Sequence, residues 1–408
     1  MKVAVVGGGL AGLAAALDLV DAGHDVTLYE ARPTLGGAVQ TLPEREGDPA
    51  GPPDNGQHIA LGCFTEYLRF LDRIGEGGSY LRTQLGLPVV DENGRFARIA
   101  PSLHRLLRYG HLAPRDRVRI PLVTARCRNA RANPGETFGT LLRRLGASDA
   151  AVDRFWDVFI RPALNLPSDE VDAAAGLFTV RTALLGPRAN SDLILPTKPL
   201  GWMHGDAAGR VLGDRVRLER RVETLDELDA DAVVLAVPPR ESARLLGEPE
   251  PALEDSPIVS VHLWFDRPLL DVPLAALLGT DAHWVFDRGR LLGDSTRSVG
   301  QYLTVVSSGV PELLAVRGRE LVERIAAQLT ERLGSAELLW SRVSREPYAT
   351  IALRPGVHRP GVETSRPDVA RAGTWTDTGW PATMESAIRS GRRAAQHILS
   401  SSSARVTT

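Results

Sequence analysis

The glycines near the N-terminus have the spacing of a dinucleotide-binding turn. Gly7, Gly9 and Gly12 fit the pattern G-x-G-x-x-G, and Glu30 follows Gly12 by eighteen positions. In such a turn the first glycine permits a tight bend, and the second lets backbone approach a pyrophosphate at a helix N-terminus. The third lets helix and strand pack closely, and the acid accepts hydrogen bonds from the adenosine ribose. This spacing therefore predicts a bound dinucleotide.

Two strands and a helix must hold these residues in place. Residues 2–6 (KVAVV) form an apolar, β-branched run typical of a buried parallel strand. From Leu10 onward apolar residues recur at helical spacing until Gly23, and residues 25–29 predict a second strand ending at Glu30. A glycine-rich turn can be purely structural, but strand, turn, helix, strand and acid in this order favour nucleotide binding.

A polar turn, Asp54-Asn55-Gly56-Gln57-His58, precedes the apolar residues 59–63. A polar cluster that contains glycine and leads into an apolar run often lines a site. On composition alone, an ordinary surface turn is an equal alternative.

The residues after Glu30 distinguish FAD from NAD. Arg32 and the pair Gly36-Gly37 resemble the extended fingerprint of the flavin amine oxidase and carotenoid desaturase superfamily. In that superfamily the second glycine pair lets the chain pass close to the flavin-side phosphate, and an arginine usually follows the pair. Here Ala38 stands in that place, so one phosphate contact is missing or is supplied from elsewhere.

Three further segments narrow the resemblance. Residues 54–58 (DNGQH), 230–239 (ADAVVLAVPP) and 375–385 (WTDTGWPATME) closely resemble the squalene-associated FAD-dependent desaturases, which are the hydroxysqualene dehydroxylases. The likeness runs nearly from end to end and includes residues 259–266 (VSVHLWFD). It implies an FAD-dependent oxidoreductase that removes the hydroxyl of hydroxysqualene to give squalene in hopanoid biosynthesis.

The resemblance also implies the architecture. We expect an α/β fold with a Rossmann-like FAD-binding domain, a parallel sheet covered by helices, and a mixed α+β substrate domain that holds an apolar tunnel. The FAD-binding domain is expected to comprise residues 1–64, 205–250 and 350–400. The substrate domain is expected to comprise residues 65–204 and 251–349, with a disordered tail at 401–408.

Periodicity adds individual elements. Helical spacing predicts helices at 65–74, 136–145, 151–166 and 321–333, and apolar runs or alternation predict strands at 232–236, 258–265 and 302–306. A β-like repeat lies within 211–225. Proline and small residues after Gly373 indicate a helix whose N-terminus is closely approached, and in this superfamily that helix faces the flavin C2 carbonyl.

The cofactor-binding residues that the fingerprint and the resemblance imply come from four parts of the chain. They are Gly7, Gly9, Leu10, Ala11, Gly12, Glu30, Ala31, Arg32, Gly36, Gly37, Ala38, Gly56, Val222, Gly373, Thr374, Asp377 and Met384. Relatives usually carry an aspartate after the glycine equivalent to Gly373, where it binds the ribityl chain. Here Thr374 stands there, and its hydroxyl or Asp377 is the expected substitute.

Dehydroxylation of an isoprenoid needs a proton for the leaving water, stabilisation of an allylic cation and a hydride from the reduced flavin. His58 and Asp54 are the candidate proton sources, although either can simply hydrogen-bond backbone or cofactor. A carotenoid-type desaturase or an amine oxidase on the same fold is an alternative. Thr383 argues against the amine oxidase, because the amine oxidases have an aromatic-cage tyrosine at the position just before Met384. A third alternative, motivated by Ala38 and Thr374, is a flavin-binding protein without catalysis.

The composition bounds the partners. A net charge of −2 over 408 residues gives no global reason to expect nucleic acid, and Cys63 and Cys127 match no metal or redox spacing. No uncharged stretch is long enough to span a bilayer. Residues 95–131 hold ten arginines and one acid, interleaved with leucines, which predicts either a solvated face or a surface that meets anionic lipid. We expect a cytoplasmic protein with peripheral membrane association, an apolar isoprenoid substrate and an electron donor that the sequence does not identify.

Overall fold

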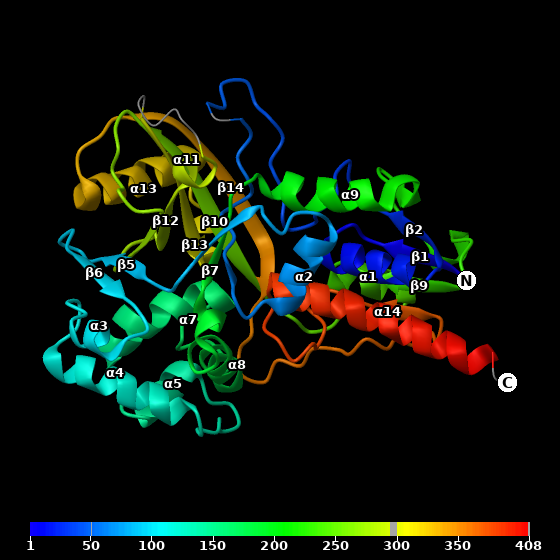
Figure 1. The fold of residues 1–408 in the computed structure, drawn as a ribbon, viewed down its shortest axis with the longest axis horizontal. Coiled ribbons are helices and arrows are strands. Elements are labelled where there is room, and N and C mark those ends of the chain that lie inside the picture. Colours follow the sequence, from blue (N-terminus) through cyan, green and yellow to red (C-terminus); the bar gives the residue numbers. More distant parts are fainter. Residues whose placement is uncertain (50, 294–299, 407–408) are drawn as a thin grey trace.

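A parallel sheet forms one end of the molecule. The computed structural model describes residues 1–49, 51–293 and 300–406. The five strands of the parallel sheet lie in the order β15-β9-β1-β2-β8 (Figure 1). They are β1 (Lys2–Val6), β2 (Asp25–Tyr29), β8 (Val216–Arg217), β9 (Ala232–Leu235) and β15 (Val369–Arg371). The strands come from each of the three segments expected to build the FAD-binding domain, and the predicted α/β class is confirmed.

A second, mixed sheet of seven strands forms the other half, in the order β14-β10-β13-β12-β11-β5-β6. Its strands are β5 (Leu87–Val90), β6 (Phe96–Ile99), β10 (Asp255–Phe265), β11 (Leu274–Leu277), β12 (Trp284–Asp287), β13 (Gln301–Ser308) and β14 (Leu338–Ile351). A small three-stranded sheet joins β3 (Ala60–Leu61), β7 (Leu193–Pro196) and β4 (Tyr80–Thr83) in that order. The strands predicted at 232–236, 258–265 and 302–306 are therefore confirmed as β9, β10 and β13.

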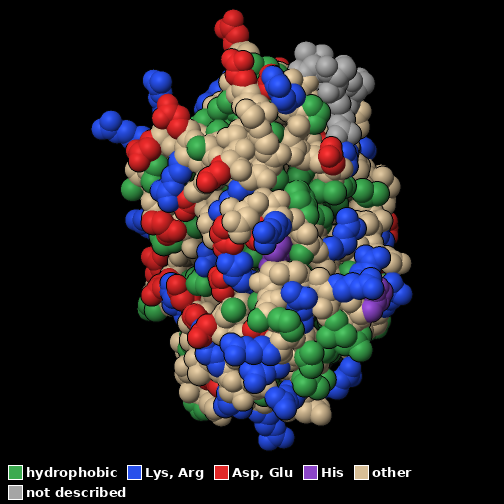
Figure 2. Space-filling view, turned by 90° about the vertical axis from the view of Figure 1, so that its left-hand side faces the viewer, with side chains coloured by type: hydrophobic (Ala, Val, Ile, Leu, Met, Phe, Trp, Pro, Cys, Tyr) green, Lys and Arg blue, Asp and Glu red, His purple; other side chains and the backbone are tan. Residues whose placement is uncertain are grey.

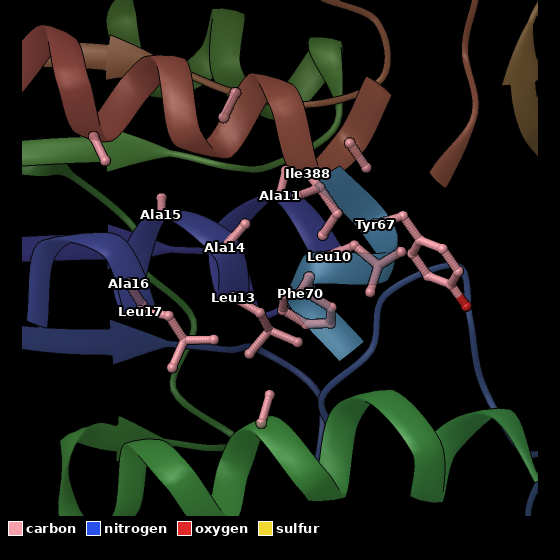
Figure 3. Packing of buried hydrophobic residues seen from close by; sticks show 14 of the residues in the cluster. Leu10, Ala11, Leu13, Ala14, Ala15, Ala16, Leu17, Tyr67, Phe70 and Ile388 are labelled. Carbon is pink, nitrogen blue, oxygen red and sulfur yellow. The ribbon is translucent and has the colours of Figure 1, made fainter. Parts of the chain in front are cut away.

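Helices α1 (Leu10–Asp21) and α14 (Met384–Val406) run side by side against the parallel sheet (Figure 1). Figure 3 shows the apolar residues of α1, including Leu13 and Leu17, packed together with Phe70 of α2 (Thr65–Arg73) and Ile388 of α14. The helices approach closely because α14 carries Gly391, where an added Cβ would lie 2.0 Å from the Ala11 carbonyl oxygen. The elements that flank the glycine turn thus share one core.

The remaining described helices lie between the strands along the chain. They are α3 (Leu103–Leu107), α4 (Pro114–Cys127), α5 (Phe138–Arg144), α6 (Asp149–Ala151), α7 (Asp157–Leu164), α8 (Ala173–Thr179), α9 (Ala207–Leu212), α10 (Pro239–Leu246), α11 (Arg288–Leu291), α12 (Pro311–Leu314) and α13 (Gly318–Leu333). π-Helical turns occupy Val152–Trp156, Val180–Leu184 and Trp202–Asp206, and 3₁₀ turns occupy Arg188–Ser191, Gly213–Arg215 and Leu225–Glu227. The helices predicted at 65–74, 136–145, 151–166 and 321–333 are confirmed with shifted ends.

Two expectations differ from the structure. Within residues 211–225, where a β-like repeat was expected, only β8 forms a strand, and 3₁₀ turns lie before and after β8. The tail expected to be disordered at 401–408 continues α14 as far as Val406, and residues 407–408 lie outside the described chain. In this last part of α14 the hydroxyls of Ser400 and Ser401 donate to the carbonyl oxygens of Gln396 and His397 one turn earlier.

The α1–α14 contact generates a stability prediction. Gly391→Ala should lower the free energy of unfolding by about 1–3 kcal/mol, because the new methyl group must displace the α1 backbone. Gly318→Ala is the matched control, because an added Cβ on Gly318 meets nothing within 4 Å. The control should leave the melting temperature unchanged or raise it. If both variants melted at the same temperature as wild type, the close approach of α1 and α14 at Gly391 would not contribute to stability.

Candidate functional site

The glycine turn and the second glycine pair lie against each other at the carboxyl end of β1. A Cβ on Gly7 would lie 2.2 Å from the Ala236 carbonyl oxygen, and one on Gly37 would lie 2.7 Å from Gly9 Cα. Gly7 and Gly37 also have positive φ values of 106° and 62°, which favour glycine. A side chain at either position would clash with neighbouring backbone, so only glycine lets these segments pack so closely. Both glycines line the cavity together with Gly9, and backbone amides there can meet a pyrophosphate. The residues present therefore fit the diphosphate of FAD.

Glu30 holds this turn at the end of β2. One carboxylate oxygen accepts a hydrogen bond from the Gly8 amide at 2.7 Å, and the other accepts one from the Arg32 amide at 2.8 Å. Glu30 also lines the cavity that begins at the glycine turn. A carboxylate in this place can still accept hydrogen bonds from a ribose, because each of its oxygens has more than one lone pair.

A continuous cavity of about 1130 Å³ extends from this cradle into the second half of the molecule. Fifteen of the seventeen expected cofactor-binding residues line it; the exceptions are Gly12 and Asp377. The far part of the wall is dominated by apolar side chains, including Leu87, Trp156, Phe159, Trp284, Phe286 and Val306. One space thus joins a polar, glycine-lined end to an apolar end.

Gly12 and Asp377 lie outside the described cavity wall. Gly12 serves packing, since its Cβ would lie 1.9 Å from the Gly7 carbonyl oxygen. The Asp377 side chain is 60% exposed and accepts a hydrogen bond from the Gly379 amide, so it is not placed to substitute for the missing aspartate. Thr374 does line the cavity and stays the candidate for that contact.

The N-terminus of α14 faces the cavity, because Thr383 and Met384 belong to its wall. Glu385 fixes this end: its buried carboxylate accepts hydrogen bonds from the amides of Glu66 and Tyr67 at 3.2 and 2.8 Å. These amides lie in the first turn of α2, so each helix start is tied to the other. The positive end of the α14 dipole favours negative charge on a group bound in front of it.

The cation that Ala38 does not provide has other sources. Arg32, Arg220 and Arg240 line the same cavity. The Ala38 carbonyl itself accepts a hydrogen bond from the Asn55 side chain at 2.8 Å, which ties the glycine pair to the polar turn. These arginines could therefore make the phosphate contact that an arginine in place of Ala38 would have made.

Asp54, one of the two candidate proton sources, is engaged elsewhere. Its side chain is buried, forms an ion pair with Arg288, and accepts hydrogen bonds from the Leu200 amide at 2.7 Å and the Thr41 hydroxyl at 2.8 Å. Asp54 is also outside the described cavity wall. Its carboxylate fixes the turn instead of facing a substrate, which corrects the expectation from the sequence.

His58 does line the cavity, and its Nδ1 is buried without a partner among the described residues. Burial, aided by the charges of His204 and Arg288, lowers the pKa of His58 to about 4. The imidazole is therefore neutral at pH 7. A neutral ring can donate or accept a hydrogen bond, but it does not carry the extra proton that an imidazolium acid would give.

Three residues at the site carried no signal in the sequence. Arg288 donates to Asp54 and to the Gln57 side chain at 2.9 Å, and Glu346 lines the cavity, where its pKa is raised by burial. Asn165 also lines the cavity, and it has a left-handed backbone with φ of 53°. Each lies far along the chain from the glycine motifs, and none belongs to a recognisable pattern.

Known proteins resemble this chain over almost its whole length. The family model of flavin-containing amine oxidoreductases matches residues 10–399. Hydroxysqualene dehydroxylase from Sinorhizobium fredii is 31% identical, with 98% of each chain covered. The protein of the same name from Rhodopseudomonas palustris is 29% identical over 97% of this chain and 98% of its own. Zeta-carotene desaturase from Arabidopsis thaliana is 24% identical over 98% of this chain and 85% of its own.

Solved structures agree on the fold. Cyclohexylamine oxidase from Brevibacterium oxydans superimposes with a TM-score of 0.74 at 18% identity, covering 98% of this chain and 99% of its own. Reduced UDP-galactopyranose mutase gives a TM-score of 0.72 at 15% identity, covering 98% of this chain and 95% of its own. At these identities the likeness concerns architecture alone.

The position of Glu30 generates a prediction about the cofactor. Glu30→Ala should weaken FAD binding by about 1–3 kcal/mol, because a charge-assisted hydrogen bond to the ribose is lost and the Gly8 amide loses its acceptor. Titration of the apoprotein with FAD, followed by flavin fluorescence, measures the effect. Glu44→Ala removes the same charge from an exposed position and should leave the affinity unchanged. Equal affinities for wild type and Glu30→Ala would refute the ribose contact.

Proposed function

Because this chain belongs to the family of flavin-containing amine oxidoreductases, and is an FAD-dependent oxidoreductase, we propose that it converts hydroxysqualene to squalene by reductive dehydroxylation. The observation that carries the proposal is the continuous cavity. Its glycine-lined end fits FAD, and its other end offers an apolar wall to a long hydrocarbon. The hydroxysqualene dehydroxylases, which match nearly end to end, support this choice of substrate.

The reaction replaces a hydroxyl by hydrogen: the C–O bond breaks, a proton joins the leaving oxygen to form water, and a hydride forms the new C–H bond. FAD, when bound and reduced, supplies that hydride. The apolar wall keeps water from a cationic carbon, and the α14 N-terminus favours negative charge on the cofactor. We propose that the neutral His58 makes a hydrogen bond to a group bound beside the polar turn of residues 54–58. The electron donor that reduces FAD belongs to a partner of unknown identity.

Carotenoid-type desaturation is the second candidate. It is favoured by the zeta-carotene desaturases, whose similarity covers 98% of this chain at 24–26% identity. The two reactions run in opposite redox directions, because desaturation consumes oxidised FAD and dehydroxylation consumes reduced FAD. Amine oxidation is disfavoured by Thr383, which lines the cavity at the position where an amine oxidase would carry an aromatic residue.

The redox direction gives the test of function. Photoreduced holoenzyme, incubated anaerobically with hydroxysqualene, should reoxidise and yield squalene in a one-to-one ratio, measured by absorbance and mass spectrometry. Oxidised holoenzyme with the same substrate is the control and should yield none. Unchanged hydroxysqualene in both samples, together with desaturation of a carotenoid precursor by oxidised enzyme, would replace the proposal by the second candidate.

We extend the proposal to peripheral association with an anionic bilayer, from which so apolar a substrate would be collected. Helices α3 and α4 pack together and expose Leu103, Leu107, Val118 and Leu122, each at least 40% accessible. Exposed arginines, including Arg105 and Arg119, lie among them. Apolar side chains flanked by basic ones are visible on the lower part of the face in Figure 2. None of the described helices is long and apolar enough to cross a membrane.

Charge reversal tests this association. Replacing Arg105, Arg108, Arg115 and Arg119 by glutamate should abolish flotation with vesicles containing phosphatidylserine, since each basic residue near such a surface contributes about 1 kcal/mol. Added salt should weaken wild-type binding. The matched control reverses four exposed arginines on other elements, namely Arg69, Arg210, Arg267 and Arg319. Equal flotation of both variants and wild type would make the α3–α4 face an ordinary solvated surface.

A further inference from the structure

A small polar cluster interrupts the apolar part of the cavity wall. It comprises Asn165, which follows α7, Thr350 near the end of β14, and Ser308 at the end of β13. All three line the cavity, and Asn165 and Ser308 are only 3% and 4% exposed. Polar side chains in a wall built for hydrocarbon carry a desolvation cost unless they find hydrogen-bond partners. Their hydrogen bonds therefore show what the cluster can bind.

The Asn165 side chain is oriented by three acceptors. Its Nδ2 donates to the carbonyl oxygens of Ser256 and Pro257 at 2.8 and 3.3 Å, and to Thr350 Oγ1 at 3.1 Å. The opposite amide orientation would set Oδ1 against two carbonyls, so the observed one is the stable choice. The left-handed backbone of Asn165, with φ of 53°, turns the chain at the end of α7 and brings the amide to this position.

The donation from Asn165 determines what Thr350 can offer. Because Thr350 Oγ1 accepts this hydrogen bond, the hydroxyl hydrogen points elsewhere, and no acceptor for it is recorded among the described residues. Thr350 is half-buried and lines the cavity, so its hydroxyl can be reached from inside. Thr350 thus presents a hydrogen-bond donor within a mainly apolar wall.

The same wall leads back to the cofactor end. Glu346, four residues before Thr350 on β14, interacts with the side chain of Asn55 in the polar turn. Residues 346–351 of β14 line the cavity without interruption between these points. A ligand that contacts Thr350 therefore shares a continuous surface with the FAD cradle.

We propose that Thr350 donates a hydrogen bond to the hydroxyl oxygen of the substrate and that Asn165 is the residue that positions it. This inference rests on the proposed function, since it assigns the single polar group of a long hydrocarbon to the Asn165–Thr350 pair. A donor at the hydroxyl oxygen fixes the direction of the C–O bond that breaks. The product lacks that oxygen and cannot accept the hydrogen bond, so Thr350 also distinguishes substrate from product.

Binding to the oxidised holoenzyme, which does not reduce the ligand, isolates this contact. Titrations with hydroxysqualene and with squalene, followed by the flavin absorbance change, give the ratio of their dissociation constants. In wild type, hydroxysqualene should bind about tenfold more tightly, the effect of one hydrogen bond whose loss leaves a buried donor unpaired. Thr350→Val keeps the shape and should reduce the ratio to near one. Thr350→Ser restores the hydroxyl and should keep the preference within about twofold of wild type.

Asn165 and the fold need their own variants. In Asn165→Asp the new carboxylate accepts the Thr350 hydroxyl hydrogen, so the preference for hydroxysqualene should also be lost. Ser256→Ala removes a hydrogen bond to the Asn165 backbone without touching the Asn165–Thr350 pair, and it should keep the preference. FAD content and melting temperature are measured for every variant. If Asn165→Asp does not fold, the role of Thr350 is tested by comparing Thr350→Val with Thr350→Ser.

The outcomes separate this inference from the proposed function. If wild type reduces hydroxysqualene but Thr350→Val keeps the full preference, the function stands and the role of Thr350 is refuted. If wild type neither binds nor reduces hydroxysqualene, the proposed function fails and the assignment of Thr350 fails with it. Loss of the preference in both Thr350→Val and Thr350→Ser would also refute the assignment, because the serine hydroxyl should replace that of threonine.

Discussion

The site depends on a buried ion pair between the two halves of the molecule. Asp54 belongs to the turn that follows the glycine motifs, and Arg288 follows β12 of the seven-stranded sheet; each is 3% exposed. Asp54 also accepts from Leu200 and Thr41, and Arg288 also donates to Gln57. Charges removed from water are tolerated only when their hydrogen bonds are satisfied. The geometry of the turn carrying His58 is therefore set by groups that must stay in contact.

The sequence was sufficient for the cofactor end because its signals are local. The turn at Gly7–Gly12, the helix after it and the acid at Glu30 lie within thirty residues, and each has a steric or electrostatic requirement that few residue types meet. Ten of the expected cofactor residues that line the cavity lie within residues 7–38, and the other five, farther along the chain, came from the family resemblance. The two that do not line the cavity, Gly12 and Asp377, differ in kind. Gly12 fulfils the packing role expected of it, whereas Asp377 was expected to make a contact that its exposed position does not allow.

The rest of the site could not be predicted because it forms between distant segments. Asp54 and Arg288 are 234 residues apart, and Asn165 and Thr350 are 185 apart. Neither spacing has a period, and each residue type alone is common on protein surfaces. The sequence therefore singled out the turn of Asp54, whose neighbours Asn55 to His58 line the cavity, but it could not show that the Asp54 carboxylate was already engaged. Similarly, the pKa of His58 depends on burial by residues that no local pattern identifies.

The contrast between the two ends of the cavity has a consequence for turnover. In the proposed reaction an apolar wall would bind substrate and product almost equally, because both present the same hydrocarbon surface. A tunnel of this kind would hold its product unless some interaction were specific to the substrate. Under the assignment proposed for Thr350, its hydroxyl supplies that difference: it is paired when the substrate hydroxyl is present, and it is left without a partner when the product is bound. The same desolvation cost that makes polar groups rare in an apolar wall thus weakens product binding and favours release.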